Sequence, residues 1–190
     1  MLFRSGNRAY APTSDKPYFR SYTVEYLGNV VGGRGVTYVN VPMNVIRECL
    51  ISQLRDGAPV WFGSDCGKFA MREEGVFDRA SLCVENLFGI HFTLDKGERL
   101  ALYDSLPNHA MLLQGVHLDP AGKPVRWRIE NSWGDESGKD GYYVASDNWL
   151  GEYAYQFVVN KKYLDASVLA CLGKPPIVLP AWNPMGTLAD

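Results

Sequence analysis

Hydrophobic residues recur at helical spacing between residues 42 and 55. Pro42 stands at the start of this stretch and Gly57 lies just past its end, which is the usual placement of these two residue types around a helix. We therefore predict a helix over 42–55 with one buried face. The apolar positions that form this face are Val45, Ile46, Cys49, Leu50 and Leu54.

Weaker patterns predict further helices. Asp95 followed by Glu98 matches a capping box, which predicts a helix from residue 96 to about residue 105. Residues 78–89 and 161–172 are also expected to be helical, and a short turn or helix is expected around 148–152.

After Pro107 the pattern changes to that of β-strands. Residues 109–118 form one run, 119–123 carry the Pro and Gly of a turn, and 125–130 alternate apolar and charged residues. Shorter strands are predicted at 60–62, 142–145 and 155–159. Because the hairpin at 109–130 makes part of the sheet antiparallel, the expected fold class is α+β, with helices packed on one side of the sheet.

The two ends of the chain differ from its middle. Residues 1–22 are polar and are expected to form an extended segment, and residues 23–174 are expected to form the main domain. The tail over 175–190 carries four prolines, which exclude a helix, yet it is apolar. An exposed apolar tail would form a hydrophobic patch prone to aggregation, so we expect an extended arm docked in a groove.

Composition narrows the function classes. The chain has 190 residues, 46% of them hydrophobic, which is typical of one globular domain. Its formal net charge of −2 shows no excess of basic residues of the kind that binds nucleic acid. No apolar run is long enough to span a membrane, and the first residues lack the apolar core of a secretory signal, so the expected compartment is the cytoplasm. The four cysteines form no Cys-x-x-Cys pair, and we expect no metal site, no disulfide and no cofactor.

One pair of polar residues falls where a hairpin brings distant positions together. His109 begins the first strand of the hairpin and Asn131 follows the second, so both are expected at the same end of the two strands. An Asn amide oxygen can accept a hydrogen bond from one imidazole nitrogen and leave the other free to pair with a nucleophile. Trp133 is placed to cover that hydrogen bond and exclude water.

The segments Asn108-His-Ala-Met111 and Glu130-Asn-Ser-Trp-Gly134 resemble the His and Asn blocks of papain-like cysteine peptidases. Within that group the chain is most similar to bleomycin hydrolase and bacterial aminopeptidase C, and the resemblance covers roughly residues 20 to 190. The further segments that carry it are 22–27, 31–34, 59–63, 127–134 and 179–186.

The resemblance implies a papain-like C-terminal domain, with an antiparallel sheet or half-barrel, packed helices and an extended C-terminal arm. It implies that His109 is the general base, that Asn131 orients it and that Trp133 shields the pair. In this family the arm lies in the active-site cleft, where its terminal carboxylate meets the free amine of the substrate and imposes aminopeptidase behaviour. The residues at the end of the arm are Leu188, Ala189 and Asp190.

The chain departs from the family in its thiols. The nucleophilic Cys of the family lies in an N-terminal segment that has no counterpart here. Cys49, Cys83 and Cys171 fall in predicted helices, and Cys66, the only candidate in a loop, does not occupy the family's nucleophile position. We therefore interpret all four as structural or incidental, and predict that this polypeptide alone hydrolyses no aminoacyl substrate.

Two functions follow from these residues. The first is the C-terminal half of a cysteine aminopeptidase that acts on peptides through a Cys-His-Asn triad, with the Cys-bearing half as its partner. The resemblance also implies a homo-hexamer for the full protein. The alternative is a non-catalytic module of the same fold that binds a peptide or a partner subunit. No membrane association is expected, and nucleic-acid binding, known for some relatives, has no support in the charge pattern.

Overall fold

The computed structural model describes residues 7–10, 16–28, 31–33 and 35–187, and it places the long predicted elements where the sequence patterns indicated. Helix α1 spans Met43–Arg55 and strand β7 spans His109–Leu118. The other helices are α2 (Val84–Phe88), α3 (Lys96–Ala101), α4 (Asp147–Tyr153) and α5 (Ala166–Leu172). The other strands are β1 (Asn7–Tyr10), β2 (Arg20–Val24), β3 (Tyr38–Asn40), β4 (Val60–Ser64), β5 (Ala70–Met71), β6 (Val76–Phe77), β8 (Pro124–Glu130), β9 (Tyr142–Ser146), β10 (Ala154–Val159) and β11 (Ile177–Leu179).

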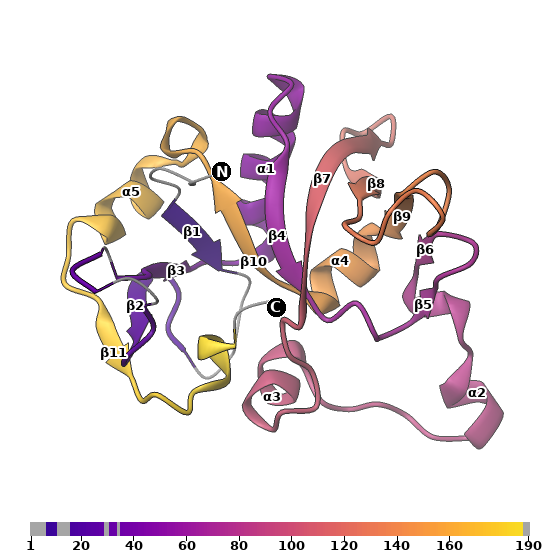
Figure 1. Ribbon diagram of the computed structural model, residues 1–190, viewed down its shortest axis with the longest axis horizontal. Coiled ribbons are helices and arrows are strands. Elements are labelled where there is room, and N and C mark those ends of the chain that lie inside the picture. Colours follow the sequence, from indigo (N-terminus) through magenta and orange to yellow (C-terminus); the bar gives the residue numbers. More distant parts are fainter. Residues whose placement is uncertain (1–6, 11–15, 29–30, 34, 188–190) are drawn as a thin grey trace.

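The described strands join in one sheet in the order β11-β2-β3-β1-β10-β4-β7-β8-β9-β6-β5. The central run from β10 to β9 is antiparallel throughout, as the hairpin pattern predicted. Three pairs nearer the edges are parallel, β1 with β3, β2 with β11 and β6 with β9. The mixed sheet with its helices confirms the α+β fold class (Figure 1).

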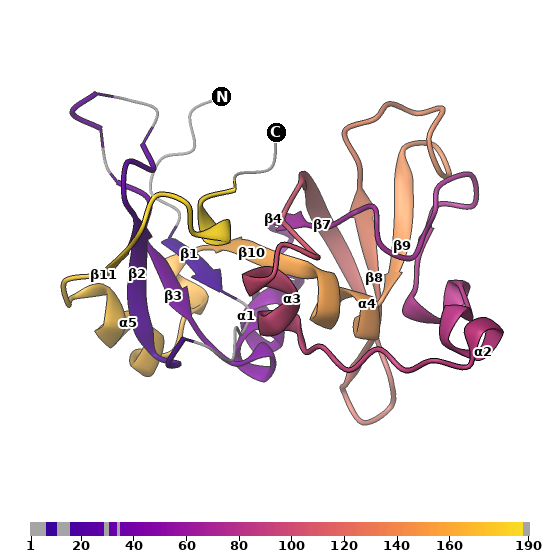
Figure 2. The same ribbon diagram turned by 90° about the horizontal axis from the view of Figure 1, so that it is seen from below.

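The two faces of the central sheet are covered by different parts of the chain. Phe62 and Phe157 are fully buried on the face that meets α1, whose own buried residues include Ile46 and Leu50. The neighbouring residue Gln156 points to the other face, where its amide meets the C-terminal segment. Figure 2 shows α1 and α5 on one side of β10 and the C-terminal segment on the other. Alternation along each strand thus separates a core face from a face that receives the arm.

Strands β8, β9 and β6 lie in the right-hand part of Figure 1, and their side chains contribute several buried aromatic rings to the same core. Trp127 of β8 and Trp149 of α4 are fully buried, and the ring of Phe77 stacks between Trp149 and Tyr143 at centroid distances of 4.6 and 4.9 Å. These rings bind α4 and the short strands to the hairpin that carries the site, because large aromatic surfaces contribute strongly when buried.

Helix α3 also begins as predicted and is tied to α4. Asp95 and Glu98 form the capping box. The side chain of Lys96 is buried and donates hydrogen bonds to the carbonyls of Gly151 and Ala154 at the end of α4. Burial lowers the pKa of this ammonium group well below its ordinary value.

Three predicted helices are shorter or broken. The helix expected to reach about residue 105 ends at Ala101, because Tyr103 adopts a left-handed backbone conformation with φ of 60°. The helix expected over 78–89 is a 3-10 turn at Arg79–Ser81 followed by α2. The helix expected over 161–172 splits into a 3-10 turn and α5, because the Asp165 side chain accepts the Val168 N–H and so caps a new helix that begins at Ala166.

The expected division at residues 22 and 174 stays a prediction. Strand β2 runs across residue 22 and pairs with β11 of the C-terminal segment, and residues 1–6 and 11–15 lie outside the described ranges. Across the described ranges, no helix is both long and apolar enough to cross a lipid bilayer.

Candidate active site

His109 and Asn131 are brought together by the pairing of β7 with β8. His109 is the first residue of β7, where it lies opposite Ser64 of β4, and Asn131 directly follows the last residue of β8. The turn between the strands is closed by Asp119, whose carboxylate accepts a hydrogen bond from the Lys123 amide at 2.8 Å. The sequence prediction that the two site residues meet at one end of the hairpin is confirmed by the geometry.

The imidazole is held by one amide oxygen. His109 Nε2 lies 2.8 Å from Asn131 Oδ1, and the same oxygen accepts the backbone N–H of Ser132 at 2.7 Å. Because an amide oxygen only accepts, Nε2 is the donor and carries the ring proton of the neutral imidazole. His109 Nδ1 is then the nitrogen with a free lone pair, and both side chains are at least nine-tenths buried.

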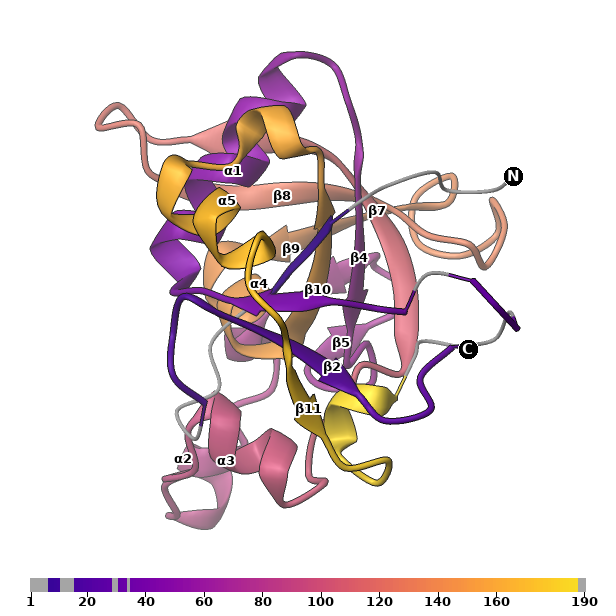
Figure 3. The ribbon, with the colours of Figure 1, turned by 90° about the vertical axis from the view of Figure 1, so that its left-hand side faces the viewer.

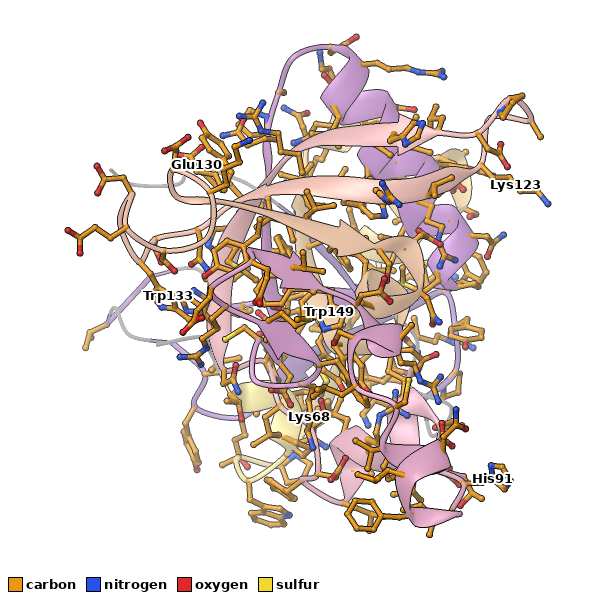
Figure 4. All side chains as sticks on the ribbon, turned by 90° about the vertical axis from the view of Figure 1, so that its right-hand side faces the viewer. Lys68, His91, Lys123, Glu130, Trp133 and Trp149 are labelled. Carbon is orange, nitrogen blue, oxygen red and sulfur yellow. The ribbon has the colours of Figure 1, made fainter. Side chains whose placement is uncertain are left out.

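Trp133 covers this hydrogen bond. Its ring stacks on the His109 ring at a centroid distance of 4.5 Å and an angle of 24°, and it makes a T-shaped contact with Tyr143 at a centroid distance of 6.2 Å. The guanidinium carbon of Arg72 lies 4.7 Å from the centroid of the same indole. Imidazole and guanidinium therefore both lie close to the indole, which is 37% exposed and labelled at the edge of the molecule in Figure 4.

The loop 134–141 that follows Trp133 is tightly folded around Tyr143. Gly138 has φ of 65°, and a Cβ atom there would lie 2.7 Å from the Tyr143 ring, so only glycine fits. Tyr143 donates its hydroxyl to the backbone carbonyl of Arg72 at 3.2 Å. The loop returns at Gly141, whose carbonyl accepts the backbone N–H of Asn131 at 3.0 Å. Loop and aromatic core thus set the position of Trp133 and of the residue that orients the imidazole.

A second polar cluster lies directly beside His109, and sequence reasoning missed it. Asp65 follows the end of β4 and is buried, and its carboxylate accepts hydrogen bonds from Ser105, Asn108 and Gly67. The local sequence signal is slight, because Asp65 and Asn108 lie more than 40 residues apart in irregular stretches of the chain.

The cysteines have the surroundings of structural thiols. Cys49, Cys66 and Cys171 are buried, Cys83 is exposed, and all four are free thiols. Burial raises the pKa of Cys49 to about 11 and also raises the pKa of Cys66. Since the thiolate is the nucleophilic form, burial works against nucleophilic chemistry at both positions.

The C-terminal segment is extended and anchored up to residue 187. Strand β11 pairs with β2, Met185 is buried, and the Gln156 amide donates to the Thr187 carbonyl at 3.2 Å. Tyr103 donates its hydroxyl to the carbonyl of Trp182. Figure 3 shows β11 leading into the last turn beside β2. The predicted gating residues Leu188, Ala189 and Asp190 lie outside the described residues.

Comparison with known proteins agrees with this geometry. The model of the Peptidase C1-like family matches residues 8–186, and the chain belongs to that family. It is 51% identical over 180 residues to aminopeptidase C of Streptococcus thermophilus and 43% identical over 181 residues to bleomycin hydrolase of Gallus gallus. The resemblance to bleomycin hydrolase and aminopeptidase C is therefore confirmed.

A solved structure extends the likeness to the whole fold. The structure of PepW from Lactobacillus rhamnosis aligns with this chain with a TM-score of 0.92 at 45% identity. The alignment covers 96% of this chain and 42% of the PepW chain. The matches to aminopeptidase C and bleomycin hydrolase cover 95% and 94% of this chain but 40% of each relative. The chain thus spans about two fifths of the length of these relatives and corresponds to their C-terminal part.

Proposed function

We propose that this chain is the His- and Asn-bearing part of a cysteine aminopeptidase that removes N-terminal residues from peptides. The observation that carries the proposal is the His109 Nε2 to Asn131 Oδ1 hydrogen bond of 2.8 Å beneath the Trp133 ring. This arrangement leaves Nδ1 as the one ring nitrogen able to exchange a proton with a nucleophile and a leaving group.

In the proposed reaction a cysteine thiolate attacks the carbonyl carbon of the first peptide bond. The His109 imidazolium then gives its Nδ1 proton to the departing amine as the C–N bond breaks, which leaves a thioester. Neutral His109 next takes a proton from water at Nδ1, and the resulting attack on the thioester releases the amino acid and restores the thiolate. Asn131 keeps Nε2 protonated in every step, so the same nitrogen always faces the reacting atoms.

The thiol in this proposal comes from a Cys-bearing N-terminal half. The raised pKa values of the Cys49 and Cys66 thiols support this, because neither surrounding favours a thiolate. Exposed apolar side chains around α2, including Leu87 at 77% and Phe88 at 68%, support a further protein surface against this side of the chain. We extend the proposal to a cytoplasmic enzyme, to a homo-hexamer of the full protein, and to gating by the end of the arm.

A non-catalytic module that binds a peptide or a partner subunit is the second candidate. It is favoured by one observation, the buried surroundings of three of the four thiols in a chain that keeps the His and Asn pair. The two candidates differ in outcome once a cysteine half is supplied, because only the first then gives turnover.

The test is a single-chain chimera. The N-terminal part of aminopeptidase C from Streptococcus thermophilus would precede this chain from residue 8 onward, and hydrolysis of a fluorogenic aminoacyl amide would be measured. We expect no turnover from this chain alone and clear turnover from the chimera. The substitution His109→Ala should lower turnover by roughly a thousandfold or more, as loss of a triad member does.

The matched control is His117→Ala, because His117 lies on the same strand but is exposed, and its turnover should be unchanged. A folded chimera that gives no turnover would favour the non-catalytic module. Turnover that survives His109→Ala would overturn the assigned chemistry.

A further inference from the structure

We propose that Asp65 is a positioning residue for His109, acting through hydrogen bonds that clamp the connection entering β7. This inference rests on the proposed role of His109 and adds a residue to the machinery of the same site. Asp65 would act through Ser105 and Asn108 and would touch no reacting atom.

The contacts of Asp65 reach the residue directly before the imidazole. Its Oδ1 accepts from Asn108 Nδ2 at 3.0 Å and from the Gly67 backbone N–H at 3.3 Å. Its Oδ2 accepts from the Ser105 hydroxyl at 2.9 Å. Asp65 is 5% exposed and Ser105 is 1% exposed, so the Ser105 hydrogen bond is shielded from water, whereas Asn108 is exposed and the bonds to Asn108 and Gly67 are partly buried.

The clamp works in both directions. The Asn108 Oδ1 accepts the backbone N–H of Cys66 at 3.2 Å, so the chain just after β4 and the chain just before β7 each donate to the other. The next pair along the sheet is Ser64 opposite His109. Asp65 also donates its backbone N–H to the Tyr153 carbonyl at 2.9 Å, which ties the clamp to the end of α4.

The burial of Asp65 makes its carboxylate dependent on these hydrogen bonds. No basic side chain pairs with Asp65 within the described parts of the chain, so its buried carboxylate depends on the three donors. A buried carboxylate that loses a donor is strongly penalised. Movement of Ser105 or Asn108 away from the carboxylate is therefore opposed.

Without the clamp, little regular structure would hold this connection. Residues 104–108 belong to neither α3 nor β7, and Tyr103 lies in the left-handed region. The backbone N–H groups of Asp104 and Ser105 donate to the Arg99 carbonyl at 2.9 and 3.2 Å, so the clamp acts mainly on residues 106–108. Irregular segments outside helices and strands open most easily. Asn108 directly precedes His109 in the chain. Motion of the connection would therefore change the orientation of the imidazole, which needs a fixed geometry toward Asn131.

The test reads the His109 ring in this chain directly, with no thiol or substrate present. Long-range 1H–15N correlation spectra report which ring nitrogen carries the proton, and His109→Gln identifies the signals. In Asp65→Ala and in Asn108→Ala, we expect the ratio of the Nε2–H to the Nδ1–H tautomer to fall by about fivefold to tenfold, the bias that one hydrogen bond supplies. The double substitution should cause no further fall, because both changes remove the same clamp.

Two variants separate the clamp from other effects. Asp65→Asn should keep the ratio within about twofold, because its amide oxygen can still accept from Asn108 and Gly67 while its NH2 group donates to the Ser105 hydroxyl. Asp104→Ala removes an exposed carboxylate from the same connection and should leave the ratio unchanged. Circular dichroism confirms folding, and Ser105→Ala, which removes one donor only, replaces Asp65→Ala if that variant unfolds.

An unchanged ratio in folded Asp65→Ala or Ser105→Ala would overturn the proposal. An Asp65→Asn variant as impaired as Asp65→Ala would overturn the clamp as well, because the charge and not the hydrogen bonds would then matter. An inactive chimera together with a ratio that responds to Asp65→Ala would reject the proposed catalysis while leaving the positioning role intact.

Discussion

At the scale of single residues, the site depends on how one imidazole is held and covered. His109 Nε2 and Asn131 Oδ1 form a buried hydrogen bond, Trp133 stacks on the imidazole, and the guanidinium of Arg72 lies against the indole. A hydrogen bond is stronger where water cannot compete for its partners, and the indole provides that exclusion. The exposed fraction of Trp133, 37%, shows that it forms the boundary between the pair and solvent.

Replacing Trp133 with Leu is therefore expected to expose the hydrogen bond. The His109 Nε2 proton should exchange with solvent about tenfold faster, because local opening limits such exchange. NMR line widths of that proton at several pH values give the rate. Trp182→Leu is the control, since Trp182 is 77% exposed on the arm and should leave the rate unaltered. Equal rates in the Trp133→Leu variant and the parent chain would show that the indole does not shield the pair.

At the scale of elements, three of the short helices, α3, α4 and α5, are each started by a single side chain. Asp95 caps α3, Ser146 caps α4 and Asp165 caps α5, each by accepting a backbone N–H of the first turn. Helices of six or seven residues have little stability of their own, so caps and packing decide where they begin. This explains why the predicted helix over 161–172 divides at Asp165.

The cap at Asp165 predicts a dependence of stability on pH. The hydroxyl of Ser167 and the backbone N–H of Val168 lower the pKa of the Asp165 carboxyl. The stabilisation is therefore fully present above the unfolded pKa of about 3.9 and is lost as pH falls through the lower folded pKa. At pH 7, Asp165→Ala should lower the free energy of unfolding by about 1 kcal/mol.

Urea denaturation at pH 7 and at about pH 3 measures this difference. The gap between the parent chain and Asp165→Ala should shrink at the lower pH. Asp165→Asn is the matched control, because Asn caps a helix well but carries no charge to titrate. A gap of the same size at both pH values would refute the charged cap.

At the scale of the whole molecule, the arm is held on the face of the sheet opposite α1. Gln156 binds the Thr187 carbonyl, Met185 is buried, and a Cβ atom at Gly186 would lie 3.2 Å from Val24. These contacts lead the chain toward its last three residues from a fixed anchor. In the proposed enzyme, such an arm would admit only substrates with a free amino terminus.

Deleting the chain from Gly186 onward in the chimera tests this role. We expect cleavage of an N-acetylated peptide to rise by about tenfold or more relative to the same peptide with a free amine, because the barrier to internal bonds is gone. Both rates would be measured by mass spectrometry of the products. Trp182→Leu, which alters the arm but leaves it in place, should keep the original preference. An unchanged preference after the deletion would show that the arm has no gating function.

The sequence by itself determined the elements with strong local patterns and the pairing of two site residues in one hairpin. Helix α1, strands β7 and β8, and the meeting of His109 with Asn131 follow from periodicity and a short turn, because each of these signals lies within one helix or one hairpin. The resemblance to one peptidase family could also be read from the residues alone, since it is spread over many segments.

Only the tertiary structure decided the contacts that join distant segments. The Asp65 clamp spans about 40 residues, the stack of Arg72 on Trp133 about 60, and the pairing of β11 with β2 more than 150. Local patterns carry no signal for such pairs, because their formation depends on how the whole sheet is ordered and on which face each residue is buried. His109, Asn131 and Trp133 could therefore be identified from the sequence, whereas the contacts of Asp65 and Arg72 that support them appear only when the chain is folded.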